Sequence, residues 1–264
     1  MEPFYFRKAS KPLLGIYHPP KINMVQNVGV VLCYPMGQEY IRSYRSLVQL
    51  ARLLSSAGIH VLRFDYYGCG DSDGDCTQGS FQQWIDDILA AVNELDKGCG
   101  LGKVCLAGLR LGATLAMIAG TKQSDIDSII LWDPVTDGKI YLEESISLHN
   151  KWLQGSFAKP QLENPTKKIK ELLGFPMTDS MREELVKINL LRFEQKPANN
   201  ILIIETDEVT QNDWLKSHLQ SIGVQTNYEH IPSAKIWHKN DMDNKGLVPT
   251  PILQRIVAWI SEVY

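Results

Sequence analysis

The chain has 264 residues, of which 44% are hydrophobic, enough to bury one large core. Its 27 basic and 30 acidic residues give a formal net charge of −3, so no basic surface points to nucleic acid or an anionic membrane. No apolar run approaches the roughly 18 residues that span a bilayer, and the N-terminus lacks the basic-then-apolar order of a signal peptide. We therefore expect a cytoplasmic protein with a small-molecule or protein partner.

Apolar runs alternate with amphipathic segments through the first half of the chain. Two short strand-like pieces around a polar turn come first, within residues 3–19. The strands then expected are 28–35, 60–68, 103–109 and 127–134. The helices expected between them are 44–58, 80–95 and 111–120. Such β-α-β units in series predict an α/β fold with a mostly parallel sheet and helices on both of its faces.

The strand pattern stops at residue 136 and resumes near residue 198. Within this stretch, "TKKIKELLGF" (166–175) reads as the start of a Lys-rich helix and "SMREELVKINLL" (180–191) as an amphipathic helix. The alternation then continues with strands at 200–206 and 224–232 and helices at 211–223 and 251–264. We expect one core of residues 1–135 and 198–264, with residues 136–197 as a helical cap insertion.

The stretch "VCLAGLRLGATLA" has an apolar strand, a G-x-x-x-G turn and a helix rich in small residues. Together with "YPMGQEY", "RFDYYGCGDSDG" and the insertion, it resembles the α/β-hydrolase fold, whose nucleophile stands on such a strand-to-helix turn. Gly108 and Gly112 flank the turn, where a side chain would collide with the neighbouring strand or helix. The residue between them is Arg110.

Arg110 makes this a degenerate nucleophile elbow. A guanidinium stays protonated and has no lone pair, so Arg110 cannot attack a carbonyl or hold an acyl group. Its neighbours offer no replacement, since Leu109 and Leu111 are apolar and Thr114 faces the wrong way one helical turn on. The sequence therefore argues against Ser-His-Asp hydrolysis.

Longer stretches are similar to the second family of hydrolase-like proteins associated with the exosortase A system. They are "YPMGQEYIRSYR", "GIHVLRFDYYGCGDSDGD", "WIDDILAAV", "AGLRLGATLA", "LWDPVTDGKIYL" and "KELLGFPMTDSM". The resemblance implies that arginine at the elbow is a feature of the group. It also implies a setting in bacterial exopolysaccharide and exosortase loci, with an acyl carrier protein and an acyl-activating ligase nearby, hence acyl or thioester chemistry.

Residues at the other triad positions can be compared with the fold. Asp207 follows the strand after the cap, where the triad acid stands, and can equally be a loop or capping aspartate. Asp133, before Pro134, is a second candidate acid or a turn residue. His238 lies in the loop before the last helix, where the triad histidine stands, and can equally be a polar loop residue.

The charge of Arg110 requires an anion, because an unpaired charge at the base of a pocket is costly to desolvate. Glu39, two residues after Gly37, or Asp207 supplies an internal partner that would plug a dead site. Alternatively Arg110, with the N–H groups of Met36 and Leu111, binds a carboxylate, phosphate or sulfonate. In the chain without ligand, an internal carboxylate can pair with Arg110, and a ligand anion can then displace that carboxylate.

Two classes of function follow. In the first, the protein is a pseudoenzyme that binds an acyl, sugar or carrier-linked anion, with an acyl carrier protein as candidate partner. In the second, it is a thioesterase-like ester or thioester hydrolase or acyltransferase that uses water activated by His238 and Asp207, with Arg110 as oxyanion stabiliser. The five cysteines form no CxxC pair, so we expect no metal, and no motif indicates a cofactor. Apolar cap helices on this fold would suit a homodimer.

Overall fold

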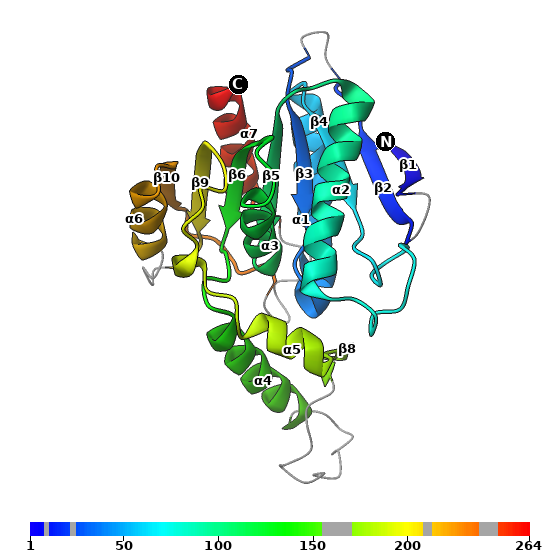
Figure 1. Cartoon of the computed structure of the whole chain (residues 1–264), viewed down its shortest axis with the longest axis vertical. Helices are drawn as coiled ribbons and strands as arrows, with labels where there is room; N and C mark the ends of the chain where they lie inside the picture. The colour runs from blue at the N-terminus through cyan, green and yellow to red at the C-terminus, as the bar shows by residue number, and fades with distance from the viewer. Residues whose placement is uncertain (8–10, 22–24, 155–170, 208–212, 238–247) are drawn as a thin grey trace.

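A computed structural model describes residues 1–7, 11–21, 25–154, 171–207, 213–237 and 248–264 (Figure 1). In these residues one large sheet contains the strands β1 (Glu2–Phe6), β2 (Leu13–His18), β3 (Gly29–Cys33), β4 (His60–Phe64), β5 (Val104–Leu109), β6 (Ile126–Trp132), β9 (Asn200–Glu205) and β10 (Gln225–His230). Their spatial order is β1-β2-β4-β3-β5-β6-β9-β10. Neighbouring strands are parallel from β4 to β10, and β2 is antiparallel to both β1 and β4. The predicted mostly parallel sheet is confirmed.

Helices cover both faces of this sheet, as the alternating pattern predicts. They are α1 (Gly37–Ser56), α2 (Phe81–Cys99), α3 (Leu111–Gly120), α6 (Asp213–Ser221) and α7 (Thr250–Val263). α1 packs against α7 on one face, and α2 packs against α3 on the other (Figure 1). α6 packs against β10 at the edge of the sheet.

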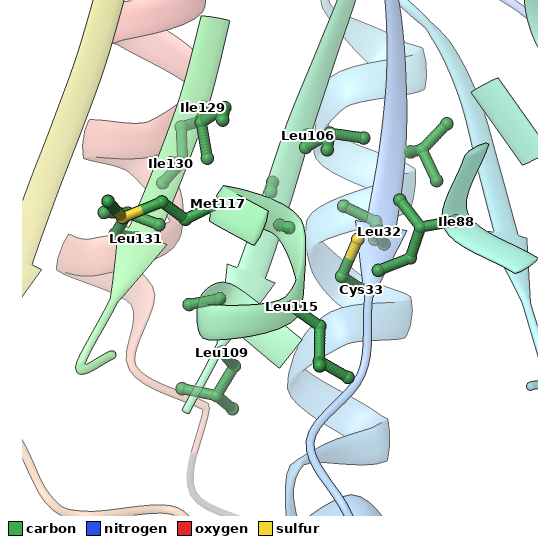
Figure 2. Packing of buried hydrophobic residues seen from close by; sticks show 14 of the residues in the cluster. Leu32, Cys33, Ile88, Leu106, Leu109, Leu115, Met117, Ile129, Ile130 and Leu131 are labelled. Atoms are coloured by element: carbon green, nitrogen blue, oxygen red, sulfur yellow. The ribbon is translucent and has the colours of Figure 1, made fainter. Parts of the chain in front are cut away.

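The central strands are buried along their whole length. Every residue of β3 and of β5 is buried, because helices cover both faces of a parallel sheet. Figure 2 shows Ile88 of α2 beside Leu32 of β3 and Met117 of α3 beside Leu131 of β6. This core holds the carboxyl ends of β3, β5, β6 and β9 at one edge of the sheet, where ligand sites of open α/β sheets lie.

The segment between β6 and β9 stands at that edge. It contains α4 (Gly138–Gln154), β7 (Glu171–Leu172), β8 (Phe175–Pro176), α5 (Asp179–Leu185) and the 3₁₀ helix η1 (Leu190–Arg192). α4 and α5 lie below the carboxyl ends of the strands in Figure 1. We refer to this segment as the cap.

Besides the expected helix at 180–191, which as α5 ends at Leu185, two expectations for local structure are wrong. The described part of the expected Lys-rich helix is the β7–β8 hairpin, because Leu173 and Gly174 both have positive φ (53° and 86°), as a two-residue hairpin turn requires. α1 begins at Gly37, not at Tyr44. Its first two turns are mostly polar, so they carry no periodic apolar signal from which the sequence could predict them. The second correction places Glu39 and Arg42 on one helix.

No helix in the described part of the chain is long and apolar enough to cross a membrane. The described residues contain no group of three or more His, Cys, Asp or Glu side chains suited to a metal ion. The five cysteines are free thiols.

Candidate functional site

The turn between β5 and α3 has the strained backbone of a nucleophile elbow. Arg110 has φ 54° and ψ −125°, and its N–H donates to the carbonyl of Trp132 at 2.9 Å. A Cβ on Gly108 would lie 2.4 Å from Cα of Ala113, and one on Gly112 would lie 2.3 Å from the carbonyl oxygen of Cys33. The steric reason predicted for the two glycines is therefore confirmed.

The Arg110 guanidinium is held by protein groups on several sides. Its Nε donates to Oε1 of Glu39 at 3.2 Å, and Nη1 donates to the carbonyl of Asp133 at 3.2 Å. Its Cζ lies 5.6 Å from the ring centre of Tyr141 and 5.4 Å from that of Trp237. The other carboxylate oxygen of Glu39 accepts from the Tyr141 hydroxyl at 3.0 Å. The structure thus brings the predicted residues Arg110 and Glu39 together.

This arrangement keeps Arg110 charged. The side chains of Arg110 and Glu39 are only 19% and 16% exposed. Burial by itself lowers the pKa of Arg110, but the charge of Glu39 reverses the effect and raises that pKa above its usual value. Burial and the same carboxylate raise the pKa of Tyr141 well above its usual value, so Tyr141 stays a neutral hydrogen-bond donor.

Asp133 sits directly after β6 with φ 43°, and its carboxylate binds Thr206, directly after β9. Its two oxygens accept from the N–H and the hydroxyl of Thr206, both at 3.0 Å. Burial raises the pKa of Asp133 to about 6, although the bonds from Thr206 oppose this shift. Asp133 therefore ties the ends of β6 and β9 together, and only its carbonyl oxygen reaches Arg110.

The structure describes only one of the two predicted catalytic residues. Asp207 forms an ion pair with Lys235 at 2.5 Å, with the two side chains 55% and 38% exposed, at the rim of the site. His238 lies outside the described residues, so its position relative to Asp207 stays a prediction. The neighbouring Glu205 accepts a hydrogen bond from the hydroxyl of Tyr228.

The two predicted amide donors lie at the N-terminal ends of α1 and α3. Met36 precedes α1 in extended conformation, and Leu111 is the first residue of α3. Among the described residues, no acceptor receives the N–H group of either one. Met36 lines one cavity and Arg110 lines its neighbour, so the structure does not bring these two groups to one cavity wall.

Two adjoining cavities lie between the sheet and the cap. The larger, of about 660 Å³, has mostly apolar walls from α1, α4 and the β7–β8 hairpin. The smaller, of about 600 Å³, has more polar walls and contains Arg110, Asp133 and Asp207. Glu39, Tyr141 and Trp237 line both cavities and so form part of the wall between them.

The cap packs directly on the start of α1. Gly37 has φ 59°, and a Cβ there would lie 3.2 Å from the Phe175 ring. Trp152 and Trp237 line the larger cavity. Tyr141 and Arg42 also line it, and neither is predicted to do so. If α1 had been predicted to start at Gly37, the spacing of one helical turn between Glu39 and Arg42 would have placed Arg42 on the same face of the helix as Glu39.

The strand order, the elbow and the cap together define an α/β-hydrolase fold. Residues 29–181 match the model of the serine aminopeptidase S33 family, and the chain belongs to that family of α/β-hydrolases. Its sequence is similar to human protein ABHD12B, with 28% identity over 153 residues that cover 51% of this chain and 41% of that relative. The chain thus spans less than half of the relative's length.

Solved structures show the same fold at low sequence identity. Est1E from Butyrivibrio proteoclasticus with bound ferulic acid superposes with a TM-score of 0.66 at 17% identity, over 98% of both chains. Mouse alpha/beta hydrolase domain-containing protein 10 gives a TM-score of 0.62 at 15% identity, over 100% of both chains. Proline iminopeptidase from Mycobacterium smegmatis gives 0.64 at 13% identity, over 99% of this chain and 98% of that one. These likenesses describe the fold.

Proposed function

We propose that this member of the family does not carry out Ser-His-Asp hydrolysis and instead binds an anionic acyl ligand, free or linked to a carrier protein. The observation that carries the proposal is Arg110, which occupies the strained elbow position with its guanidinium held by Glu39 and by the carbonyl of Asp133. An arginine so placed cannot form an acyl-enzyme.

Two buried hydroxyl groups, those of Thr114 and Ser43, are bound to backbone carbonyls and do not serve as nucleophiles. Thr114, one helical turn after Arg110, is buried, and its hydroxyl donates to the carbonyl of Val135 at 2.8 Å. Ser43 of α1 is also buried and donates to the carbonyl of Glu39 at 2.8 Å. Both hydroxyl groups serve as internal hydrogen-bond donors.

The two cavities support a binding role. They offer apolar walls beside charged groups, the combination that an acyl chain with an anionic end requires. The resemblance to the exosortase-associated family supports a setting in bacterial exopolysaccharide metabolism, with an acyl carrier protein as the partner that would deliver such a ligand.

A fluorophosphonate probe, which labels activated serines, tests the absence of a nucleophile. We expect no labelling of the native chain under conditions that fully label an active serine hydrolase. Stoichiometric labelling of the native chain would contradict the proposal that the chain lacks a serine nucleophile.

Thioester turnover tests the hydrolytic alternative, in which His238 and Asp207 activate water. Decanoyl-pantetheine is incubated with the native chain and with the variants His238→Ala and Asp207→Asn. We expect no release of free thiol above the uncatalysed rate from any of them. Turnover that both substitutions abolish would establish the alternative and overturn the binding role.

A further inference from the structure

The larger cavity contains a second cation that the elbow does not use. Arg42 stands on α1, one helical turn after Glu39, and its side chain lines the cavity wall. The apolar side chains around it come from three parts of the chain: Tyr141, Leu172, Phe175, Pro176, Met177 and Trp237. A cavity of about 660 Å³ with such walls has the size and character of a small-molecule site.

The hydrogen-bond donors of Arg42 are not used within the described part of the chain. Arg42 is half-buried, and its Nε is buried without a hydrogen-bond partner. No described residue accepts a hydrogen bond from its guanidinium or forms an ion pair with it. The buried Nε is out of reach of a ligand in the cavity, but the Nη groups keep their hydrogen-bonding capacity for one.

The charges around the cavity favour an anion. Its described lining has two cationic side chains, Arg42 and Lys151, and one acidic side chain, Glu39. Glu39 already binds Arg110 with one oxygen and Tyr141 with the other. Among the described residues, no carboxylate forms an ion pair with Arg42 or Lys151.

We infer that the larger cavity binds a carboxylate carried on an apolar chain, with Arg42 as the group that recognises the carboxylate. This inference rests on the proposed function and names the class of ligand and its anchor, which lies on α1 and not at the elbow. The planar guanidinium suits an anion with two oxygens, since its two Nη groups can each donate to one oxygen. The apolar chain lies against the hairpin and Trp237.

Isothermal titration calorimetry of the full chain with decanoate, below its micelle concentration, tests the inference. Decyl phosphate carries a phosphate with three terminal oxygens in place of the carboxylate, and 1-decanol has the chain without the charge. We expect decanoate to bind at least tenfold more tightly than 1-decanol and no more weakly than decyl phosphate. Equal binding of decanoate and 1-decanol, or tighter binding of decyl phosphate, would overturn the assignment of a carboxylate.

Two variants assign the anchor. Arg42→Met keeps the apolar stem and removes the charge, and Arg45→Met makes the same change at an exposed position of the same helix. We expect Arg42→Met to weaken decanoate binding about tenfold or more, the effect of losing one charge-assisted hydrogen bond, and Arg45→Met to leave it unchanged. Unchanged binding by Arg42→Met would overturn the role of Arg42.

A third variant separates this inference from the proposed function. The double substitution Arg110→Met with Glu39→Gln removes both charges of the elbow pair together. If the double variant loses decanoate binding while Arg42→Met retains it, the anion binds at the elbow, so the proposed function stands and the anchor is wrong. If the native chain binds neither decanoate nor decyl phosphate, both proposals fail.

Discussion

Arg110 and Arg42 line adjoining cavities, and the protein surrounds their charges in opposite ways. Arg110 has a carboxylate, a carbonyl and two aromatic rings around it. Arg42 has no hydrogen bond, ion pair or aromatic-ring contact with any described residue, and its Nε is buried without an acceptor. The wall that contains Glu39 separates the two sites.

The difference shows that a charge at the position of the old nucleophile need not be the ligand-binding charge. A buried cation with a full set of partners stabilises a particular arrangement of its loops, since every partner lost leaves the charge less compensated. A cation without partners stabilises little and can recognise a ligand. Substitutions at the elbow should therefore change stability, and substitutions at Arg42 should change binding.

The largest effect on stability is expected where neighbouring backbone packs against the elbow. Gly112→Ala would place a Cβ 2.3 Å from the carbonyl oxygen of Cys33 and 2.4 Å from that of Tyr34. We expect it to lower the free energy of unfolding by at least about 3 kcal/mol, because two backbone segments would have to separate. Urea denaturation followed by circular dichroism measures this.

Gly98→Ala is the matched control, since a Cβ at this α2 position meets nothing within 4 Å. It should raise stability by about 0.5–1 kcal/mol, the difference in helix propensity between the two residues. A Gly112→Ala protein as stable as the native chain would mean that the elbow is less tightly packed than the structure indicates.

Removing the partner of Arg110 should have the next largest effect. Glu39→Gln keeps the shape of the side chain but leaves the largely buried guanidinium without its carboxylate. We expect a loss of about 2–3 kcal/mol in the free energy of unfolding. Glu144→Gln, an exposed glutamate on α4, should change stability by less than about 0.5 kcal/mol under the same conditions. Equal effects of the two substitutions would show that the elbow pair is not structural.

The raised pKa of Asp133 predicts that the free energy of unfolding depends on pH. Its folded pKa of about 6 lies above the usual 3.8, so between these values the folded state holds a proton that the unfolded state has released. Asp133 therefore lowers stability as pH rises from about 4 to about 6, with no further change above. Asp133→Asn removes this contribution and should become more stable relative to the native chain across that window, by on the order of 2 kcal/mol.

Asp127 supplies a control of opposite sign. It is partly buried, which opposes the shift, but bonds from Asn199 and Tyr264 lower its pKa. Its ionised form therefore stabilises the fold above its unfolded pKa, and this contribution is lost as pH falls through the lower folded pKa. Asp127→Asn should lose stability at neutral pH. Denaturation curves of the two variants at several pH values measure both effects, and parallel profiles would contradict the assignment for Asp133.

The smallest effect on stability is expected at Arg42. Because its guanidinium has no protein partner in the described chain, Arg42→Met should leave the free energy of unfolding within about 0.5 kcal/mol of the native value. Thermal unfolding beside Arg45→Met measures this. A loss as large as that of Glu39→Gln would mean that Arg42, like Arg110, has a structural role, and the contrast between the two arginines would disappear.

Much of the fold and the chemistry of the elbow could be predicted from the sequence. The parallel sheet follows from apolar runs such as β3 and β5, whose pattern reflects burial on both faces. Gly108 and Gly112 indicated the tight turn, and the chemistry of a guanidinium excluded Arg110 as nucleophile whatever the structure around it. These features depend on neighbours in the sequence or on the chemistry of one residue.

Only the tertiary structure decided which groups surround each charge. Tyr141 meets Glu39 across 102 positions of sequence, and Phe175 of the cap closes over Gly37. The hairpin at 171–176 and the early start of α1 depend on positive φ angles and packing that carry no periodic apolar signal. The sequence determined that Arg110 needs an anion, and the fold decided that Glu39 supplies it while Arg42 faces a cavity, because long-range packing sets those contacts.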